Sequence, residues 1–117
     1  MFGGAITYSV REFSGINVLD VSGNLTVLTA DYFKSVVHNF SERESIMINM
    51  ENVPFVTASG LNALVDVSYY ARNFGNRVII LGANIDLKEA IDYVNYFDHI
   101  IFAQSLQEGK TKIEYYT

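Results

Sequence analysis

The chain contains no cysteine. This absence excludes disulfides, thiolate metal sites and thiol nucleophiles together. Its two histidines, His38 and His99, do not form a pair at metal-ligand spacing, so we expect no metal site. The sequence also lacks the Gly-x-Gly-x-x-Gly loop of dinucleotide-binding proteins and the Gly-x-Ser-x-Gly turn of many hydrolases. We therefore expect a protein that has no cofactor and is not an enzyme.

Charged residues are scarce, at 18% of the chain, whereas hydrophobic residues make up 50%. This composition supports a buried core and argues against disorder. The formal net charge of -5 and the lack of a basic patch argue against a nucleic-acid partner. No stretch approaches the roughly 20 apolar residues of a membrane helix, and the first residues lack the basic leader of a signal peptide. We expect a cytoplasmic protein without membrane insertion.

The length of 117 residues suits one domain and is too short for two ordinary ones. No linker, internal repeat or low-complexity segment divides the chain, so we expect residues 1–117 to form a single domain. Alternating residues predict strands at 5–10 and 15–23, and Ser14-Gly15 between them is a turn signal. The chain is therefore expected to start its sheet with an antiparallel hairpin.

Helices and strands alternate after this hairpin. Apolar residues at helical spacing and short apolar runs predict helices at 29–40, 58–74, 86–97 and 105–116, and strands at 45–50, 77–82 and 99–102. The N-cap candidates of the first and third helices are Thr29 and Asp86. This order predicts an α/β fold with a mixed, mostly parallel sheet, covered by about four helices.

The junction before the second helix carries the clearest chemical candidate. Pro54 prevents the preceding strand from continuing, and the sequence Thr57, Ala58, Ser59, Gly60 then leads into a helical pattern. Ser59 either caps this helix, as serine often does, or offers a hydroxyl for modification. Glycine in a first helical turn costs roughly 0.5–1 kcal/mol relative to alanine. We therefore expect the bare backbone of Gly60 to allow close approach of a partner or a phosphate.

The residues of this junction and of later strands resemble the STAS domain family, which sulfate transporters and bacterial anti-sigma factor antagonists share. The stretch "IMINMENVPFVTASGLNALV" is similar to the family's strand, short loop, Asp-Ser-Ser/Thr-Gly turn and helix. "VSGNLTVLTADYFKSVV" is similar to its Gly-x-Leu-Asp motif followed by a Thr-Ala helix start, and "GNRVIILG" and "YFDHIIFAQSLQEG" fit its later strands. The resemblance runs from about Val18 to about Glu108.

The resemblance implies a partner-switching regulator. In stand-alone members of the family, an anti-sigma factor with serine kinase activity phosphorylates one hydroxyl of the turn, and only the unphosphorylated antagonist binds it. Ser59 falls on that position, and the expected protein is a monomer or weak homodimer. The expected surroundings of the phosphorylation site are Thr26, Thr57, Ala58, Gly60 and Asn62.

The chain departs from the family at three of these positions. Thr57 and Ala58 replace the leading Asp and the middle Ser of the turn, and Thr26 replaces the Asp of Gly-x-Leu-Asp. Phosphoryl transfer depends mostly on positioning and electrostatics, and the kinase supplies the metal and the nucleotide. A second function is open: a constitutive, non-phosphorylated STAS adaptor subunit, for example of a lipid-transport complex.

Five other side chains are considered for a role in a site. His38 is expected on a helix surface and His99 at the start of a strand, with no role in a site. Tyr69 and Tyr70, with Phe74, either pack their rings and keep the tyrosine hydroxyls in water or contact a partner, since aromatic residues are enriched at interface cores.

Overall fold

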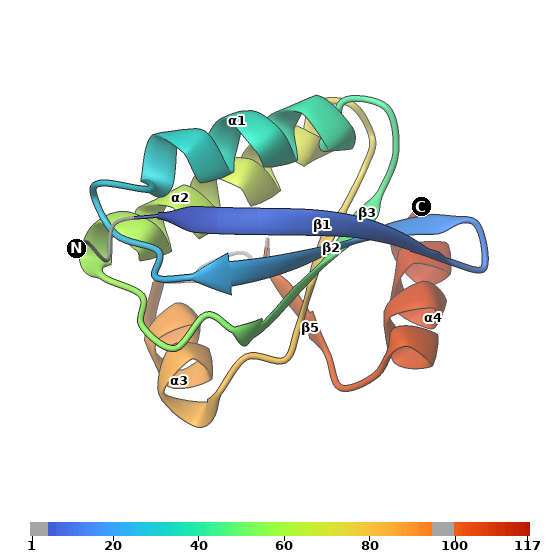
Figure 1. The fold of residues 1–117 in the computed structure, drawn as a ribbon. Coiled ribbons are helices and arrows are strands. Elements are labelled where there is room, and N and C mark those ends of the chain that lie inside the picture. The colour runs from blue at the N-terminus through green and yellow to red at the C-terminus, as the bar shows by residue number, and fades with distance from the viewer. Residues whose placement is uncertain (1–4, 95–99) are drawn as a thin grey trace.

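The computed structural model describes residues 5–94 and 100–117, in which a five-stranded sheet is covered by helices (Figure 1). The strands are β1 (Ile6–Phe13), β2 (Ile16–Gly23), β3 (Ile46–Asn52), β4 (Val78–Leu81) and β5 (Ile101–Ala103). The helices are α1 (Ala30–Ser41), α2 (Ala58–Arg72), α3 (Ile85–Val94) and α4 (Leu106–Tyr116). The strands lie in the order β1-β2-β3-β4-β5. The predicted α/β fold, with its mixed sheet and four helices, is confirmed.

The hairpin of β1 and β2 forms as the sequence predicts. The two strands pair antiparallel along the whole length of β1, from Ile6 with Gly23 to Phe13 with Ile16. The intervening Ser14-Gly15 has φ angles of 51° and 83°. Positive φ at both central residues is typical of a type I′ turn, whose twist matches that of the paired strands.

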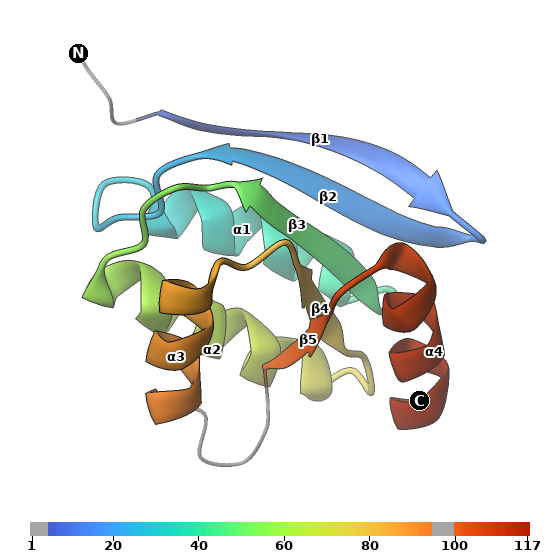
Figure 2. The same ribbon diagram turned by 90° about the horizontal axis from the view of Figure 1, so that it is seen from below.

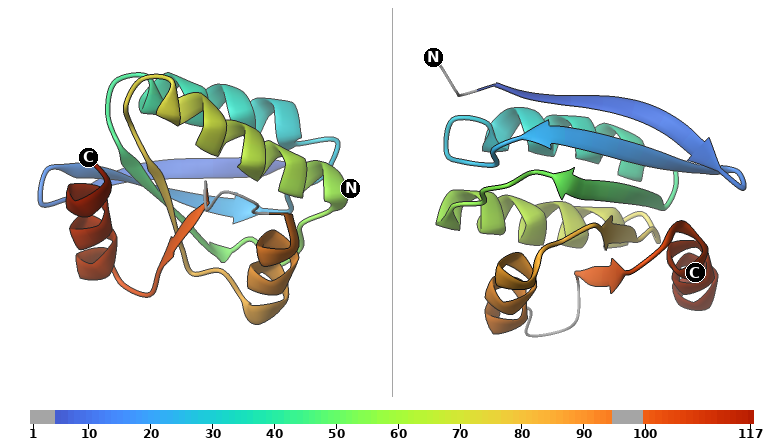
Figure 3. Two further views of the ribbon diagram at one scale, coloured as in Figure 1. Left: turned by 180° about the vertical axis from the view of Figure 1, so that it is seen from behind. Right: turned by 60° about the horizontal axis from the view of Figure 1, so that its bottom comes forward.

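The remaining strands run parallel, and this explains where the helices lie. Each connection from β2 to β5 is a crossover to the next strand in the same direction. Because such crossovers are right-handed, successive helices fall on one face. Val37 of α1, Leu64 of α2 and Ile91 of α3 accordingly share one buried cluster. Helix α4 covers the other face, where Ile113 packs in a cluster with Met47 (Figures 2 and 3).

Helix α2 presents the apolar face that its sequence predicts. Leu64 is fully buried, while Leu61 and Val65 are partly buried and pack against the same core. The helix ends at Arg72 rather than at residue 74. Its end is closed by the N–H of Asn76, which donates to the carbonyl of Ala71 at 3.0 Å.

Of the two predicted N-caps, Asp86 is wrong and Thr29 is confirmed in its position. Asp86 is not the N-cap of α3, because the Oδ1 atom of Asn84 accepts the Leu87 N–H at 2.8 Å and Asp86 lies inside the first turn. Thr29 occupies the N-cap position of α1, but its side chain does not cap that helix. Its hydroxyl instead accepts the Thr26 N–H at 2.9 Å and donates to the Asn24 carbonyl at 2.8 Å.

The ends of two predicted elements lie outside the described residues. These are the last residues of the helix predicted at 86–97 and the start of the strand predicted at 99–102, including His99. Among the described residues, no helix combines the length and the apolar character that crossing a membrane requires.

Candidate functional site

The loops that follow β2 and β3 are fastened to each other beside the start of α2. The Leu25 N–H donates to the Phe55 carbonyl, and the Thr57 N–H donates to the Leu25 carbonyl, both at 3.0 Å. Leu25 and Val56 form an isolated parallel bridge. These contacts bring Thr26 and Thr57, which are far apart in the sequence, to the same edge of the molecule.

Helix α2 is capped by Thr57 and not by Ser59. The Thr57 backbone is extended, and its hydroxyl oxygen accepts the Gly60 N–H at 3.3 Å. The interpretation of Ser59 as the N-cap is therefore wrong, because Ser59 is already the second residue of the helix. The prediction that Ser59 lies at the start of a helix is confirmed.

The Ser59 side chain is partly exposed, and within the described part of the chain its hydroxyl has no hydrogen-bond partner. The neighbouring hydroxyls are engaged. That of Thr57 also lies 3.5 Å from the Leu25 carbonyl, and that of Thr26 accepts the Leu28 N–H at 3.2 Å. Of these three hydroxyl groups, the one on Ser59 is therefore available to a reagent or a partner.

Gly60 serves internal packing rather than the approach of a partner. It is buried, and a Cβ atom at this position would lie 2.4 Å from the Leu25 carbonyl oxygen and 2.8 Å from a methyl carbon of Val56. Glycine is therefore required where α2 presses against the loop that follows β2. We expected the bare backbone of Gly60 to allow the close approach of a partner or a phosphate. That expectation is wrong, because Gly60 is buried against Leu25 and Val56.

The first turn of α2 favours a negative charge near Ser59. Within the described residues, the N–H groups of Ala58 and Ser59 have no hydrogen-bond partner, and Ala58 is exposed. The first turn contains no acidic residue. Helix N-termini bind phosphate through such free N–H groups and the positive end of the helix dipole. Asn62, which was also predicted to surround the site, is an exposed residue of α2 three positions after Ser59.

The two loops joined beside this helix start carry exposed apolar side chains, which sequence reasoning missed. Val27 and Leu28, on the loop after β2, are 72% and 81% exposed, and Phe55, on the loop after β3, is 59% exposed. We call these three residues the apolar rim. A signal was present in the sequence, because each lies in a segment predicted to be a loop and is nevertheless apolar. Exposed apolar groups gathered in one place mark interaction sites.

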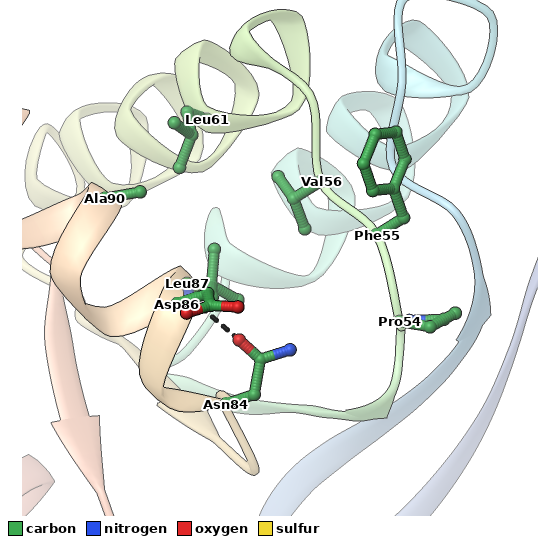
Figure 4. Close-up of a pocket in the computed structure, with 8 residues that line it drawn as sticks. All are labelled: Pro54, Phe55, Val56, Leu61, Asn84, Asp86, Leu87 and Ala90. Atoms are coloured by element: carbon green, nitrogen blue, oxygen red, sulfur yellow. Dashed lines mark hydrogen bonds between the residues drawn. The ribbon is translucent and has the colours of Figure 1, made fainter.

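A hollow of about 210 Å³ adjoins the rim, between the loop after β3 and helix α3. Val56, Leu61 and Ala90 point towards one another around it, and Asn84 and Asp86 bring polar atoms to its border (Figure 4). Its walls are mostly apolar, which extends the surface that a bound protein could cover. The hollow was not predicted from the sequence, because its two sides come from segments about thirty residues apart.

Residues 7–109 match the model of the STAS domain. The chain belongs to the STAS domain family. The match includes β1 from its second residue, and this strand precedes the start of the resemblance found in the sequence. A comparison with curated protein sequences gives no match.

Solved structures show the same STAS fold. An anti-sigma factor antagonist from Mycobacterium paratuberculosis has a TM-score of 0.75 at 16% identity, covering 95% of this chain and 96% of its own. The Bacillus cell fate determinant SpoIIAA in its phosphorylated form has a TM-score of 0.66 at 13% identity, covering 92% and 99%. The murine anion transporter Slc26a9 has a TM-score of 0.71 at 15% identity, covering 90% of this chain and 18% of its own. At these identities the similarity concerns the fold.

In this STAS domain His38 and Tyr70 lie away from the Ser59 surface, where α1 meets the middle and end of α2. The His38 ring stacks on Tyr70 with centroids 3.8 Å apart, and its Nε2 lies 3.6 Å from an Asp66 carboxylate oxygen. The Tyr70 hydroxyl donates to Glu42, and this hydrogen bond raises the pKa of Tyr70. His38 therefore packs between two helices, and the described residues contain no cluster of three or more metal-ligating acidic or histidine side chains.

Tyr69 and Phe74 are the exposed members of the aromatic group, at 46% and 49%. They lie towards the opposite end of α2 from Ser59. A partner that covers the apolar rim does not need them, and their role as partner contacts stays a prediction.

Proposed function

We propose that this STAS domain acts as an anti-sigma factor antagonist that is switched by phosphorylation of Ser59. Its partner is an anti-sigma factor with serine kinase activity. The unmodified surface around the start of α2 binds this partner, and the phosphorylated surface does not. Among the proteins of similar fold, one is an anti-sigma factor antagonist and another exists in a phosphorylated form, which supports this choice of function.

The proposal depends on one observation above all. Ser59 carries an accessible hydroxyl that caps nothing, at a helix start beside the two joined loops that carry the exposed apolar side chains of Val27, Leu28 and Phe55. A structural serine at a helix start usually caps the helix, but here Thr57 has that role. The apolar rim supplies area for docking, and Ser59 supplies the group that changes.

Phosphorylation would act on binding rather than on the fold. A phosphate at an exposed helix N-terminus is favoured by about 0.3–1 kcal/mol, so α2 should keep its structure. The same phosphate adds nearly two negative charges beside apolar groups that must lose water on binding. A penalty of about 2.8 kcal/mol would weaken binding roughly a hundredfold.

Phosphate mapping tests the site. The protein is incubated with the serine-kinase anti-sigma factor of its source organism and ATP, and the modified residue is identified by mass spectrometry. We expect phosphate on Ser59 in the native chain and in Thr57→Ala, and none in Ser59→Ala. Phosphate on Thr57 alone would move the site by two residues. No phosphate on any of the three proteins would leave the constitutive adaptor as the function.

A further inference from the structure

The two edges of the sheet differ sharply in length. Strand β5, at one edge, has three residues, whereas β1, at the other, has eight and pairs with β2 without a bulge. Within the described residues no element lies beyond β1, which forms the outer margin of the sheet (Figure 2). Strand β1 contains neither proline nor lysine, which often protect exposed edges from pairing with other chains.

The turn of the hairpin fixes which backbone groups of β1 point outwards. A β-turn joins its first and fourth residues by a hydrogen bond, so the backbone of Phe13 faces Ile16 on β2. Along an antiparallel strand, residues whose N–H and C=O groups point to the neighbouring strand alternate with residues whose groups point away from it. The residues of β1 whose N–H and C=O groups point away from β2 are therefore Ile6, Tyr8, Val10 and Glu12.

The side chains beside this edge form an apolar strip on the α1 face of the sheet. Tyr8 and Val10 are 39% and 45% exposed. The centroid of the Tyr8 ring lies 6.4 Å from the ring centroids of both Tyr32 and Phe40 of α1. Tyr32 is itself 51% exposed. Unpaired backbone groups and exposed apolar side chains thus lie side by side along one margin of the molecule.

We propose that this edge binds a second copy of the chain, with the two β1 strands antiparallel and Ser9 on the two-fold axis. A two-fold interface must be self-complementary. In this register Tyr8 faces the second copy's Val10, and Ile6 faces its Glu12, so all the outward-facing backbone groups are paired. The sheets of the two copies become continuous.

The charges of β1 agree with this register. On the opposite face of the strand, each Arg11 faces the Thr7 of the other copy. Like charges that face each other directly would weaken the pairing, and this register contains none. Arg11 is already neutralised within its own chain, because its Nε lies 2.7 Å from an Asp20 carboxylate oxygen. Strands β2 and β3 lie between this edge and α2 (Figure 2), so the dimer leaves the Ser59 of each copy open. The interface therefore differs from the proposed partner surface.

Disulfide trapping tests the register, because the native chain contains no cysteine. Residues on the axis that face each other without backbone hydrogen bonds have Cα atoms about 4.5 Å apart, within the range of disulfides. We expect Ser9→Cys to give a covalent dimer in copper-phenanthroline and air at least about tenfold faster than Thr7→Cys. Thr7 is the matched control, since it is exposed on the same face of the same strand.

Two results would overturn the proposal. One is trapping at position 9 that is no faster than trapping at position 7. The other is a native chain that stays monomeric in sedimentation velocity up to about 1 mM, where an association worth roughly 4 kcal/mol would be visible. Both variants change exposed positions, and their circular dichroism spectra should match that of the native chain.

Discussion

At the scale of single residues, the hydroxyl groups of Thr57 and Ser59 differ in what they contact. Thr57 caps α2 through the Gly60 N–H, whereas the Ser59 hydroxyl has no partner among the described residues. Loss of an N-cap typically costs about 1 kcal/mol, and surface changes without contacts usually stay within about 0.5 kcal/mol. We expect Thr57→Ala to lower the free energy of unfolding by about 1 kcal/mol and Ser59→Ala to leave it nearly unchanged, measured by urea denaturation.

The opposite order would contradict this account of the helix start. If Ser59→Ala were the more destabilising change, Ser59 would have a structural role, and its selection as the modified residue would lose its main support. Thr57→Ser is the matched control, because serine keeps a capping oxygen at the same position and should restore most of the stability.

A second residue-scale prediction concerns pH. The hydrogen bond from Arg11, and a further one from Asn49, hold the pKa of Asp20 below its ordinary value. A lowered pKa in the folded state stabilises the fold above the unfolded pKa of about 3.9, and this contribution is lost as pH falls through the folded pKa. Both side chains are partly exposed, so the expected size is about 0.2–1 kcal/mol.

Asp20→Asn measures this contribution. We expect the variant to be less stable than the native chain at pH 7 and to approach it in stability near pH 2, by denaturant unfolding at both values. Asp92→Asn, at an exposed position, serves as the control for the loss of one negative charge. An equal deficit of Asp20→Asn at both pH values would show that packing, and not ionisation, causes the loss.

At the scale of elements, the buried face of α2 determines how the Ser59 surface is positioned. Leu64 is fully buried in the main core, whereas Asn62, two residues before it, is exposed. Truncation of a buried leucine to alanine typically costs about 2–5 kcal/mol. We expect Leu64→Ala to lose stability in this range in urea denaturation and Asn62→Ala to change it by less than about 0.5 kcal/mol. Similar small losses for both variants would mean that the helix face has been assigned wrongly.

The elements differ in how far sequence could predict them. The hairpin was predictable because its signal is local: Ser14-Gly15 supplies the two positive φ angles that the turn needs. The caps of α2 and α3 were not, because several candidate residues stand near each helix start. At α2 the choice of Thr57 over Ser59 depends on the backbone contact with Leu25, which lies 32 residues earlier in the chain.

The candidate site shows the same division. The position of Ser59 at a helix start followed from the local pattern, and the resemblance to the STAS family singled out this hydroxyl. The role of Gly60 could not be predicted, because the Leu25 carbonyl that excludes a side chain there belongs to another loop. The exposure of Val27 and Leu28 could not be predicted either, because the sequence does not show whether an apolar side chain in a loop packs against the rest of the protein.

At the scale of the whole molecule, the structure offers two separate surfaces. The loops after β2 and β3 and the start of α2 form the surface around Ser59, and the free edge of β1 is separated from α2 by β2 and β3. A dimer formed through β1 would present two Ser59 surfaces at once. Phosphorylation would then control each partner contact without changing the dimer, because it alters charge at α2 and not the backbone of β1.

The most direct test of the central claim compares binding of the two forms of the protein. The unmodified chain and a chain with phosphoserine placed at position 59 are titrated by calorimetry with the serine-kinase anti-sigma factor of the source organism. We expect the phosphorylated form to bind at least about a hundredfold more weakly, a difference of roughly 2.8 kcal/mol, while its circular dichroism spectrum stays unchanged. Equal affinity of the two forms would contradict the claim that Ser59 is the switch.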